Sequence, residues 1–448
     1  MLKHNSFMLF CALNAVKGMV ITMKKQNILT KIVDKYTNTS LVLRILCGLV
    51  IGAILGIFLP NIGWIGILGD LFVGSLKAIA PLLVAVLVIS SLSQGSAKLD
   101  KRFGLILFLY IISTFLAAVV AVAGSFIFPQ TLTLAETATA EAIPTGIGEV
   151  LKNLLTSMIA NPFGSLVDGK YIGILFWAVI LGLALKKLAS DGTKQMFTDI
   201  SNAVSHAVRW IINLAPFGIL GLVYSSVSSN GLAIFTDYGK LLALLVGCML
   251  TVALVVDPLI AAIAMRRNPY PLVFRCLKES GLTAFFTRSS AANIPINMQL
   301  CEKLGLDKDM YSVSIPLGAT INMDGAAVTI TVMTLAAAHT MGVQVDILSA
   351  LVLSFLATLG ACGASGVAGG SLLLIPMACS MFGISQDVAM QVVGIGFIIG
   401  VVQDSVETAL NSAGDVMFAA TAEYTEWIKE GRELPEFMQK KKGKKISE

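Results

Sequence analysis

Pro316-Leu-Gly-Ala-Thr-Ile-Asn-Met-Asp324, followed by Gly325, is a polar interruption in a segment otherwise apolar enough to cross a bilayer. Asp324 is the only carboxylate between residues 310 and 345. A carboxylate near the bilayer centre costs roughly 2.5 to 3.5 kcal/mol on insertion, so it usually faces a protein-lined or wet cavity. The proline and the glycines predict an interrupted helix, whose freed carbonyls can coordinate a cation. This stretch therefore predicts an ion or ligand site inside the membrane.

The composition indicates a polytopic membrane protein. Of the 448 residues, 56% are hydrophobic and 13% are charged, whereas a soluble domain carries about 25% charged residues. The net charge of +5 does not indicate a nucleic-acid partner, because the basic residues cluster at the ends of apolar runs. The seven cysteines contain no Cys-x-x-Cys pair, and the three histidines are scattered. Neither a disulfide framework nor a histidine-based metal site is expected.

Six apolar runs in the first 265 residues predict membrane spans, and most reach the roughly 20 residues that a crossing needs. Basic residues cluster before the first run and after the second, fourth and sixth, which places the N-terminus and those loops in the cytoplasm. No signal peptide is expected, and Met1 and Met23 both stay open as the start. The runs are Ile45–Leu68, Leu71–Leu92, Phe103–Phe128, Ile172–Leu185 with an amphipathic lead-in, Ile211–Val227 and Leu241–Met265.

The remaining apolar segments predict two hairpins and two further spans. Basic residues flank Pro271–Met298 at both ends, so both ends are cytoplasmic and the segment predicts a re-entrant hairpin. Ile315–Ala338 then crosses outward, and Ile347–Gln386 forms a second hairpin around its glycine-rich centre. Val388–Thr421 returns to the cytoplasm. We therefore expect an all-α polytopic membrane protein with eight transmembrane helices and two opposed re-entrant helical hairpins around a midplane site.

The last span carries a polar stripe. Asp404, Thr408, Asn411 and Asp415 fall within roughly 60° of one another on a helix, and Glu407 lies about 60° to one side. Three carboxylates without a basic partner in the span require cations from elsewhere, either metal ions or a substrate ammonium. A helix end that dips into water is the alternative for Asp415.

A weaker stripe in the third span consists of Tyr110, Ser113 and Thr114, although such hydroxyls usually bond within their own helix or to a neighbour. Lys77 and Asp257 lie toward span ends, where we expect their side chains to reach the membrane surface. Arg288 lies at a predicted hairpin tip and is a candidate partner for a carboxylate of the last helix. A cytoplasmic surface position is the alternative for Arg288.

Four of these motifs resemble the dicarboxylate/amino acid:cation symporters, the glutamate transporter family. They are Thr287-Arg-Ser-Ser, the Pro316–Gly325 stretch, the glycine-rich tip at 360–370 and the stripe from Asp404 to Asp415. The resemblance covers about Leu41–Thr421, nearly the whole chain. It implies a homotrimer of elevator-type transporters driven by sodium, in which each protomer has a static scaffold and a mobile transport domain.

On this resemblance the chain divides into six parts. They are a cytoplasmic N-terminal segment (1–40), scaffold helices 1 and 2 (41–95), helix 3 of the transport domain (96–130), scaffold helices 4 and 5 (131–230), a transport core (231–422) and a basic cytoplasmic tail (423–448). The transport core comprises helix 6, the inner hairpin (Pro271–Met298), helix 7, the outer hairpin (Ile347–Gln386) and helix 8.

The resemblance also implies three sodium sites and one substrate site, position by position. The first sodium site consists of Asn322 and Asp324 with Tyr110, Ser113 and Thr114. The second consists of Gly318, Asn411 and Asp415. The third consists of Thr320 with Thr358, Leu359 and Ala361, and backbone carbonyls under the outer hairpin form it. The substrate-binding residues are Ser289, Ser290, Ala364, Ser365, Gly366, Asp404, Glu407, Thr408 and Asn411.

Glu407 departs from the pattern of the acidic amino acid carriers, which have an arginine there to hold the substrate's side-chain carboxylate. Two like charges about 4 Å apart cost on the order of 4 kcal/mol at an effective dielectric near 20, or about a thousandfold in affinity. Ala326 also replaces the family's usual threonine. Both features resemble the serine/threonine transporters of the family, in which Glu407 could accept a hydrogen bond from a substrate hydroxyl.

We therefore expect a sodium-coupled symporter, not an enzyme, that imports serine and threonine across the inner membrane, with both termini cytoplasmic. Its partners would be the amino acid, co-transported sodium ions, membrane lipid and two further copies of the chain. A carrier of another neutral amino acid or of dicarboxylates is the alternative within the family. An ion channel would instead predict a continuous pore and uncoupled flux. An intramembrane enzyme lacks a nucleophile and base on facing segments.

Overall fold

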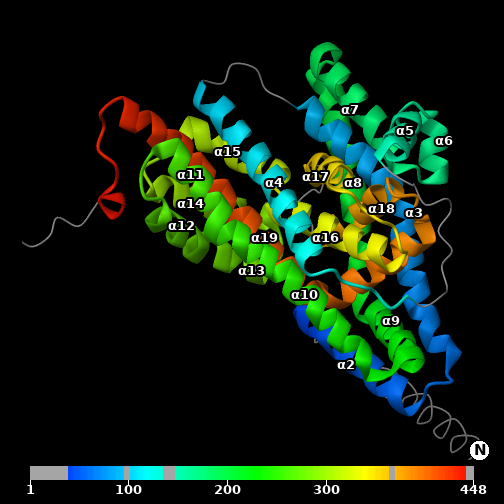
Figure 1. The fold of residues 1–448 in the computed structure, drawn as a ribbon. Coiled ribbons are helices and arrows are strands. Elements are labelled where there is room, and N and C mark those ends of the chain that lie inside the picture. Colours follow the sequence, from blue (N-terminus) through cyan, green and yellow to red (C-terminus); the bar gives the residue numbers. More distant parts are fainter. Residues whose placement is uncertain (1–38, 95–100, 135–146, 363–368, 440–448) are drawn as a thin grey trace, which may run out of the picture.

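All regular structure in the described part of the chain is helical. The computed structural model describes residues 39–94, 101–134, 147–362 and 369–439 (Figure 1). Short 3-10 or π-helical turns, labelled η, join several helices. The helices are α2 (Leu41–Phe58), α3 (Gly63–Ser93), α4 (Lys101–Ile127), α5 (Ile147–Met158), α6 (Pro162–Asp168), α7 (Tyr171–Leu188), α8 (Asp191–Asn213), α9 (Ala215–Asn230), α10 (Ile234–Thr251), α11 (Asp257–Met265), α12 (Tyr270–Cys276), α13 (Leu282–Thr287), α14 (Ser290–Lys303), α15 (Lys308–Ile321), α16 (Asp324–Thr340), α17 (Ile347–Ala361), α18 (Ile375–Ser380) and α19 (Gln386–Lys429).

The helices confirm a polytopic membrane protein. Seven helical segments within the described ranges are long and apolar enough to cross a membrane. One of these segments, Ala215–Met265, includes α9, α10 and α11. It therefore contains most of the predicted fifth run and all of the sixth, joined through the 3-10 turn η1 (Gly231–Ala233).

Two predicted span boundaries are wrong. We placed the first break between residues 68 and 71, but α2 ends at Phe58 and α3 continues through that region. Pro60 explains the earlier break, because a proline disfavours the helical conformation of the preceding residue, and Leu59 has φ −136° and ψ 56°. The predicted fifth run is divided at Leu214, where the amphipathic α8 ends and α9 begins with Pro216 near its start.

Helices break at two of the predicted polar motifs. Arg288 adopts a left-handed conformation, with φ 52°, between α13 and α14. Asn322 and Met323 separate α15 from α16, as the Pro316–Gly325 stretch predicts. The third predicted break is only partly described, since residues 363–368 lie outside the described ranges.

The first arm of the predicted outer hairpin, α17, begins with a side-chain cap. The carboxylate of Asp346 accepts hydrogen bonds from the backbone N–H groups of Leu348 and Ser349, both at 2.9 Å. The bonds from Ser349, first from its N–H and then from its hydroxyl, lower the pKa of Asp346 below its usual value. Such a cap supplies partners to N–H groups that have none within the helix.

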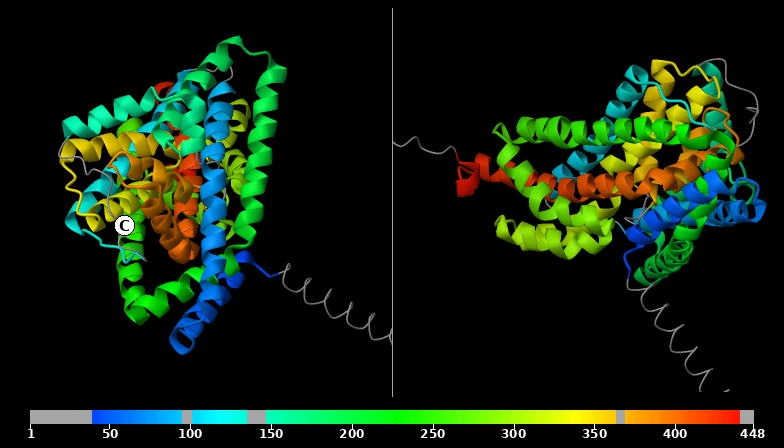
Figure 2. Two further views of the ribbon diagram at one scale, coloured as in Figure 1. Left: turned by 90° about the vertical axis from the view of Figure 1, so that its right-hand side faces the viewer. Right: turned by 90° about the horizontal axis from the view of Figure 1, so that it is seen from below.

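The long helix α19 organises one half of the molecule. It packs against α4, α10, α11, α13, α14, α15, α16 and α18, and Figure 1 shows it running through the molecule. Every residue of α16 from Asp324 to Ala338 is buried. A second group contains α2, α3, α7, α8 and α9, and Figure 2 shows α3 and α8 side by side. The two broken motifs therefore lie against the centre of α19.

Candidate functional site

Asp324 lies in a buried cluster of oxygen atoms. Its Oδ1 accepts hydrogen bonds from Ser113 Oγ at 3.0 Å and Thr114 Oγ1 at 2.8 Å, both from α4. Its Oδ2 is buried and has no hydrogen-bond partner in the described structure. Ser113 Oγ also lies 3.3 Å from Asn322 Oδ1, and the Tyr110 hydroxyl donates to the Asp415 carbonyl at 2.9 Å. The structure thus brings together all five residues of the first predicted sodium site.

The second predicted group joins the same cluster. A Cβ added at Gly318 would lie 2.8 Å from Asp415 Oδ1, so the glycine permits this close approach. Asn322 Nδ2 donates to Asp415 Oδ1 at 3.2 Å and to the Asn411 carbonyl at 3.1 Å. Asn411 Oδ1 accepts from the Gly325 N–H at 2.8 Å. Within the described ranges no lysine or arginine forms an ion pair with Asp324 or Asp415.

The third predicted group is less compact. The hydroxyls of Thr320 and Thr358 donate to carbonyls of their own helices, at 2.8 Å and 2.7 Å. Cys362 Sγ lies 3.5 Å from the Ile321 carbonyl, so the ends of α15 and α17 do meet. Ala361 is buried and Leu359 is 38% exposed. The structure brings these helix ends together without a shared side-chain oxygen.

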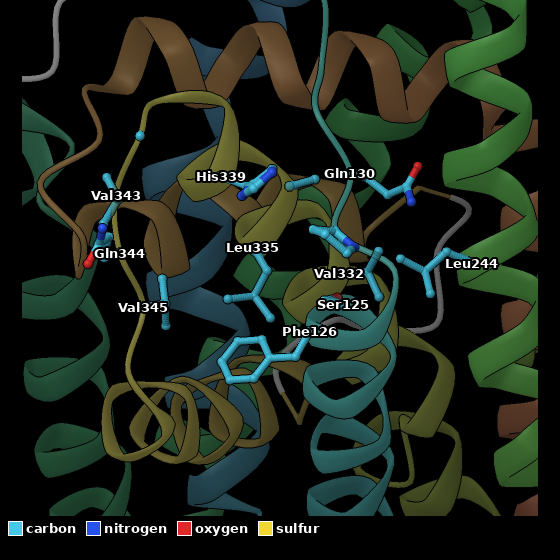
Figure 3. A pocket seen from close by; sticks show the side chains of 13 residues that line it. Ser125, Phe126, Gln130, Leu244, Val332, Leu335, His339, Val343, Gln344 and Val345 are labelled. Carbon is cyan, nitrogen blue, oxygen red and sulfur yellow. The ribbon is translucent and has the colours of Figure 1, made fainter.

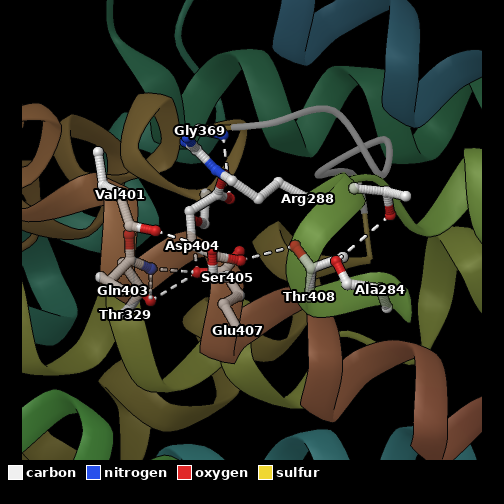
Figure 4. Close-up of polar contacts among 12 residues, drawn as sticks. Ala284, Arg288, Thr329, Gly369, Val401, Gln403, Asp404, Ser405, Glu407 and Thr408 are labelled. Atoms are coloured by element: carbon white, nitrogen blue, oxygen red, sulfur yellow. Dashed lines mark hydrogen bonds and ion pairs between the residues drawn. The ribbon is translucent and has the colours of Figure 1, made fainter. Parts of the chain in front are cut away.

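Arg288 and Asp404 form a buried ion pair between the tip of the inner hairpin and α19 (Figure 4). Arg288 Nε donates to Asp404 Oδ2 at 2.7 Å, and the Gly369 N–H donates to Oδ1 at 3.2 Å. Thr408 Oγ1 donates to the Asp404 carbonyl at 2.7 Å. The expected pairing of Arg288 with a carboxylate of the last helix is confirmed, and a surface position for Arg288 is wrong because only 9% of it is exposed.

The Glu407 carboxylate accepts its hydrogen bonds through only one of its two oxygens, among the residues that the structure describes. Its Oε2 accepts hydrogen bonds from Thr329 Oγ1 at 2.7 Å and Gln403 Nε2 at 2.5 Å (Figure 4). It also accepts one from Ser371 Oγ at 2.9 Å. Its Oε1 accepts no hydrogen bond from a residue that the structure describes. Three donors from different elements orient the carboxylate, and one oxygen stays available to a further donor.

Two serines of the inner hairpin, Ser289 and Ser290, directly follow Arg288 in the sequence. Ser289 caps α14, because its side chain accepts from the Ala292 N–H at 3.2 Å. Ser290 is buried. The other predicted substrate residues, Ala364, Ser365 and Gly366, lie outside the described ranges.

Sequence reasoning missed a polar network under the inner hairpin. Asn293 Nδ2 donates to Ser280 Oγ at 3.0 Å and to Ser412 Oγ at 2.9 Å. Asn297 Nδ2 donates to the Ser412 carbonyl at 3.0 Å and lies 3.5 Å from Asp415 Oδ2. The spacing of four residues between the two asparagines places them on one helix face and could have indicated this network. It connects the hairpin to the cluster around Asp324.

The expected surface position of Asp257 is wrong. Asp257 is only 2% exposed, because α11 packs against α19 and brings the carboxylate to its buried side. Lys77 does lie at the surface, where it pairs with Asp387.

Two larger cavities lie apart from the oxygen cluster around Asp324. One of about 560 Å³ is lined by residues of α4, α10 and α16, among them Leu244, Leu335 and His339 (Figure 3). It includes none of the predicted site residues. A second cavity, of about 450 Å³, lies between α8 and the pair α14 and α15, and Thr320 contributes to its wall.

Comparison with known proteins supports a transporter. Residues 41–425 match the model of the sodium:dicarboxylate symporter family. A protein of Bifidobacterium adolescentis named Serine/threonine transporter SstT is 64% identical over 92% of this chain and 96% of its own length. Proteins of the same name from Streptococcus thermophilus and Streptococcus agalactiae are 57% and 59% identical over 89% and 87% of this chain, and over 99% and 96% of their own lengths.

Proposed function

Since this chain belongs to the sodium:dicarboxylate symporter family, we propose that it is a sodium-coupled symporter that imports serine and threonine. Relatives that are 57% to 64% identical carry the name of serine/threonine transporters. The observation that carries the substrate assignment is the carboxylate of Glu407, which three donors orient through Oε2.

Glu407 selects against acidic substrates by repulsion. A second carboxylate about 4 Å away would cost on the order of 4 kcal/mol at an effective dielectric near 20. The hydroxyl of serine or threonine would instead donate a hydrogen bond to Oε1, which lacks a donor among the described residues. This contact favours a hydroxyl substrate over alanine, because alanine offers Oε1 no donor.

Asp404 binds the substrate ammonium. In the structure its Oδ2 is paired with Arg288, so the ammonium replaces the guanidinium or shares the carboxylate with it. Breaking a buried ion pair without replacing the lost charge costs roughly 3 to 5 kcal/mol. The substrate ammonium must therefore reach Asp404 as the guanidinium of Arg288 moves away. Asn411, Thr408 and the start of α14, with Ser289 and Ser290, hold the substrate carboxylate.

Sodium binds the oxygen cluster around Asp324 and Asp415. The end of the broken helix α15 supplies free carbonyls, as in other transporters that coordinate sodium at interrupted helices. Tyr110, Ser113, Thr114 and Asn322 complete the first position, and Gly318 and Asn411 the second. Thr320, Thr358, Leu359 and Ala361 form a third position when the outer hairpin closes.

The transport cycle follows an elevator mechanism. Eight spans and two re-entrant hairpins build each protomer of an inner-membrane homotrimer with cytoplasmic termini. Residues 41–95 and 131–230 form the scaffold, and residues 96–130 with 231–422 form the moving transport domain. The helices α2, α3, α7, α8 and α9 pack more extensively against one another than against α19, which supports this division.

Uptake by purified protein in proteoliposomes tests the function. We expect an inward sodium gradient to drive accumulation of labelled serine, threonine to compete with it, and alanine and aspartate to compete weakly or not at all. Serine flux that ignores the sodium gradient would contradict symport and favour a channel. If alanine competed with serine as well as threonine does, the protein would instead be a general carrier of neutral amino acids.

A further inference from the structure

Asn297 is a buried asparagine of the inner hairpin to which the proposed function gives no role. It lies near the middle of α14, and its side chain is fully buried. Its amide reaches α19 at Ser412 and Asp415. Asp415 is one of the carboxylates proposed above to bind sodium, so Asn297 connects the inner hairpin directly to a sodium position.

The contacts of Asn297 determine which way its amide points. Nδ2 lies 3.0 Å from the Ser412 carbonyl oxygen and 3.5 Å from Asp415 Oδ2. A carbonyl and an ionised carboxylate only accept hydrogen bonds, so the nitrogen must lie on this side of the amide. The amide nitrogen carries two hydrogens, which provide one for the carbonyl and one for the carboxylate.

Two further residues hold the opposite end of the same amide. Asn297 Oδ1 accepts hydrogen bonds from Ser280 Oγ at 2.5 Å and from Asn293 Nδ2 at 3.1 Å. Ser280 lies in the π-helical turn η3 (Leu277–Gly281), which packs against α19, and such turns frequently occur at functional sites. All three side chains are fully buried, so bulk water does not compete for these bonds. The Asn297 amide is therefore fixed at both ends.

The two oxygens of Asp415 receive hydrogen bonds from different parts of the chain. Oδ1 accepts from Asn322 Nδ2 at 3.2 Å and lies 2.8 Å from the position of a Cβ added at Gly318. It therefore faces the broken end of α15 and the proposed second sodium position. Oδ2 faces the inner hairpin, where Asn297 is its donor. A hydrogen bond at Oδ2 holds the carboxylate so that Oδ1 keeps a fixed direction.

We propose that Asn297 is a positioning residue for the second sodium position, because it orients Asp415 toward the ion. This inference rests on the proposed function and adds a residue of the inner hairpin to a position that α15 and α19 provide. Partners that hold a metal-binding carboxylate typically contribute about 10- to 100-fold to ion affinity. Ser289 and Ser290 lie at the start of the same α14, so one helix contacts both the proposed substrate site and this sodium position.

Asn297→Leu tests this role, because leucine keeps the branched shape of the side chain and lacks its N–H groups. Melting temperatures of wild-type and variant protein in detergent are measured against sodium concentration without serine, with choline as the replacement cation. A ligand that binds only the folded state raises its stability. We expect the sodium concentration that gives half of the full stabilisation to rise about tenfold in the variant.

Asn297→Thr is a second variant, which decides the question if Asn297→Leu does not fold. Its hydroxyl retains one hydrogen, so we expect a smaller rise in the sodium requirement. Equilibrium binding of labelled serine at saturating sodium should match the wild type in both variants. Asn297 lies about two helical turns from the hairpin tip, and only a general loosening of the hairpin would weaken serine binding there.

Asn293→Leu is the matched control. Asn293 is buried one turn away in the same network, and it bonds Ser280 Oγ and Ser412 Oγ rather than Asp415. Asn297 Oδ1 keeps its bond from Ser280 in this variant. We therefore expect Asn293→Leu to lower the melting temperature and to keep the sodium requirement of the wild type.

Four outcomes would overturn the inference. They are an unchanged sodium requirement in the Asn297 variants, an equal rise in Asn293→Leu, weaker serine binding at saturating sodium, and failure of both Asn297 variants to fold, which would assign Asn297 a structural role. A wild-type protein whose melting temperature ignores sodium would instead contradict the proposed sodium binding, and this inference with it. The melting experiment needs neither serine nor transport, so an error in the substrate assignment does not affect its result.

Discussion

At the scale of single residues, the buried carboxylates of Glu407, Asp404 and Asp324 each have a distinct environment. Glu407 receives three side-chain hydrogen bonds, and Asp404 receives a guanidinium. Asp324 receives two hydroxyls on one oxygen and no partner on the other. These differences give the carboxylates different expected roles, so their neutral variants should fail in different ways.

Asp324→Asn should weaken sodium activation more than folding. The amide oxygen can still accept the bonds from Ser113 and Thr114, but the variant lacks the charge that attracts the ion. We expect the sodium concentration for half-maximal serine uptake to rise about tenfold or more, and tenfold corresponds to about 1.4 kcal/mol. Asp309→Asn, at an exposed position near the start of α15, should change nothing. Unchanged sodium activation in Asp324→Asn would remove Asp324 from the ion site.

Glu407→Gln should keep part of the serine uptake, since an amide can still bond a hydroxyl, and should let aspartate compete. Glu407→Arg should abolish serine uptake and admit weak aspartate uptake, because it reverses the local charge. Competition assays on protein of unchanged melting temperature measure both effects. Glu423→Gln is the control, because Glu423 is buried on the same helix and bonds the Asp307 N–H at 2.7 Å. If Glu407→Gln loses serine and alanine uptake equally while aspartate still fails to compete, Glu407 does not determine selectivity.

At the scale of helices, small residues allow the closest approaches. Gly48, Gly52 and Gly56 form a stripe on the buried side of α2, which packs against α9. A Cβ at Gly48 would lie 2.2 Å from the Pro216 carbonyl oxygen. Small residues at a spacing of four are typical of close helix packing in membranes.

Gly52→Ala should separate α2 from α9. The added Cβ would lie 2.4 Å from the Leu220 carbonyl oxygen, and the backbone there cannot move away as a side chain could. We expect a loss of about 1 to 3 kcal/mol of stability, seen as a lower melting temperature in detergent. Gly74→Ala on α3 meets no atom within 4 Å and should be neutral or stabilising, since alanine favours helices. If the two variants had the same melting temperature, the close packing of α2 against α9 at Gly52 would be contradicted.

At the scale of the whole molecule, the proposed scaffold and transport domain face each other across a cavity of about 450 Å³. Ser205 and His206 of α8 line one side, and Ala291 and Ile294 of α14 line the other. If the transport domain slides past the scaffold, a covalent link across this cavity must stop the cycle.

Linking Ser205→Cys to Ile294→Cys in a cysteine-free background should abolish serine uptake, and cleaving the linker should restore it. The control pair, Ser90→Cys with Thr198→Cys, lies within the scaffold, where the two native hydroxyl oxygens are 3.4 Å apart. That link should leave uptake unchanged. Full uptake by the linked Ser205–Ile294 protein would contradict relative movement of the two parts.

The sequence alone determined the properties that depend on neighbouring residues along the chain. Apolar runs near 20 residues predict membrane helices, because each must satisfy its own backbone hydrogen bonds in lipid. Helix periodicity placed Asp404, Thr408, Asn411 and Asp415 on one face. The polar centre of the segment Pro271–Met298 located the break at Arg288, and the proline and glycines of the Pro316–Gly325 stretch located the break at Asn322.

Only the tertiary structure decided which distant residues meet. The pairing of Arg288 with Asp404, the three donors on Glu407 and the approach of Gly52 to Leu220 each join separate helices. Asp257 illustrates the difference most clearly. Its place along the chain favours a surface position, but the packing of α11 against α19 buries it beside Gly414. Burial depends on how helices pack in three dimensions, and local sequence carries little information about that.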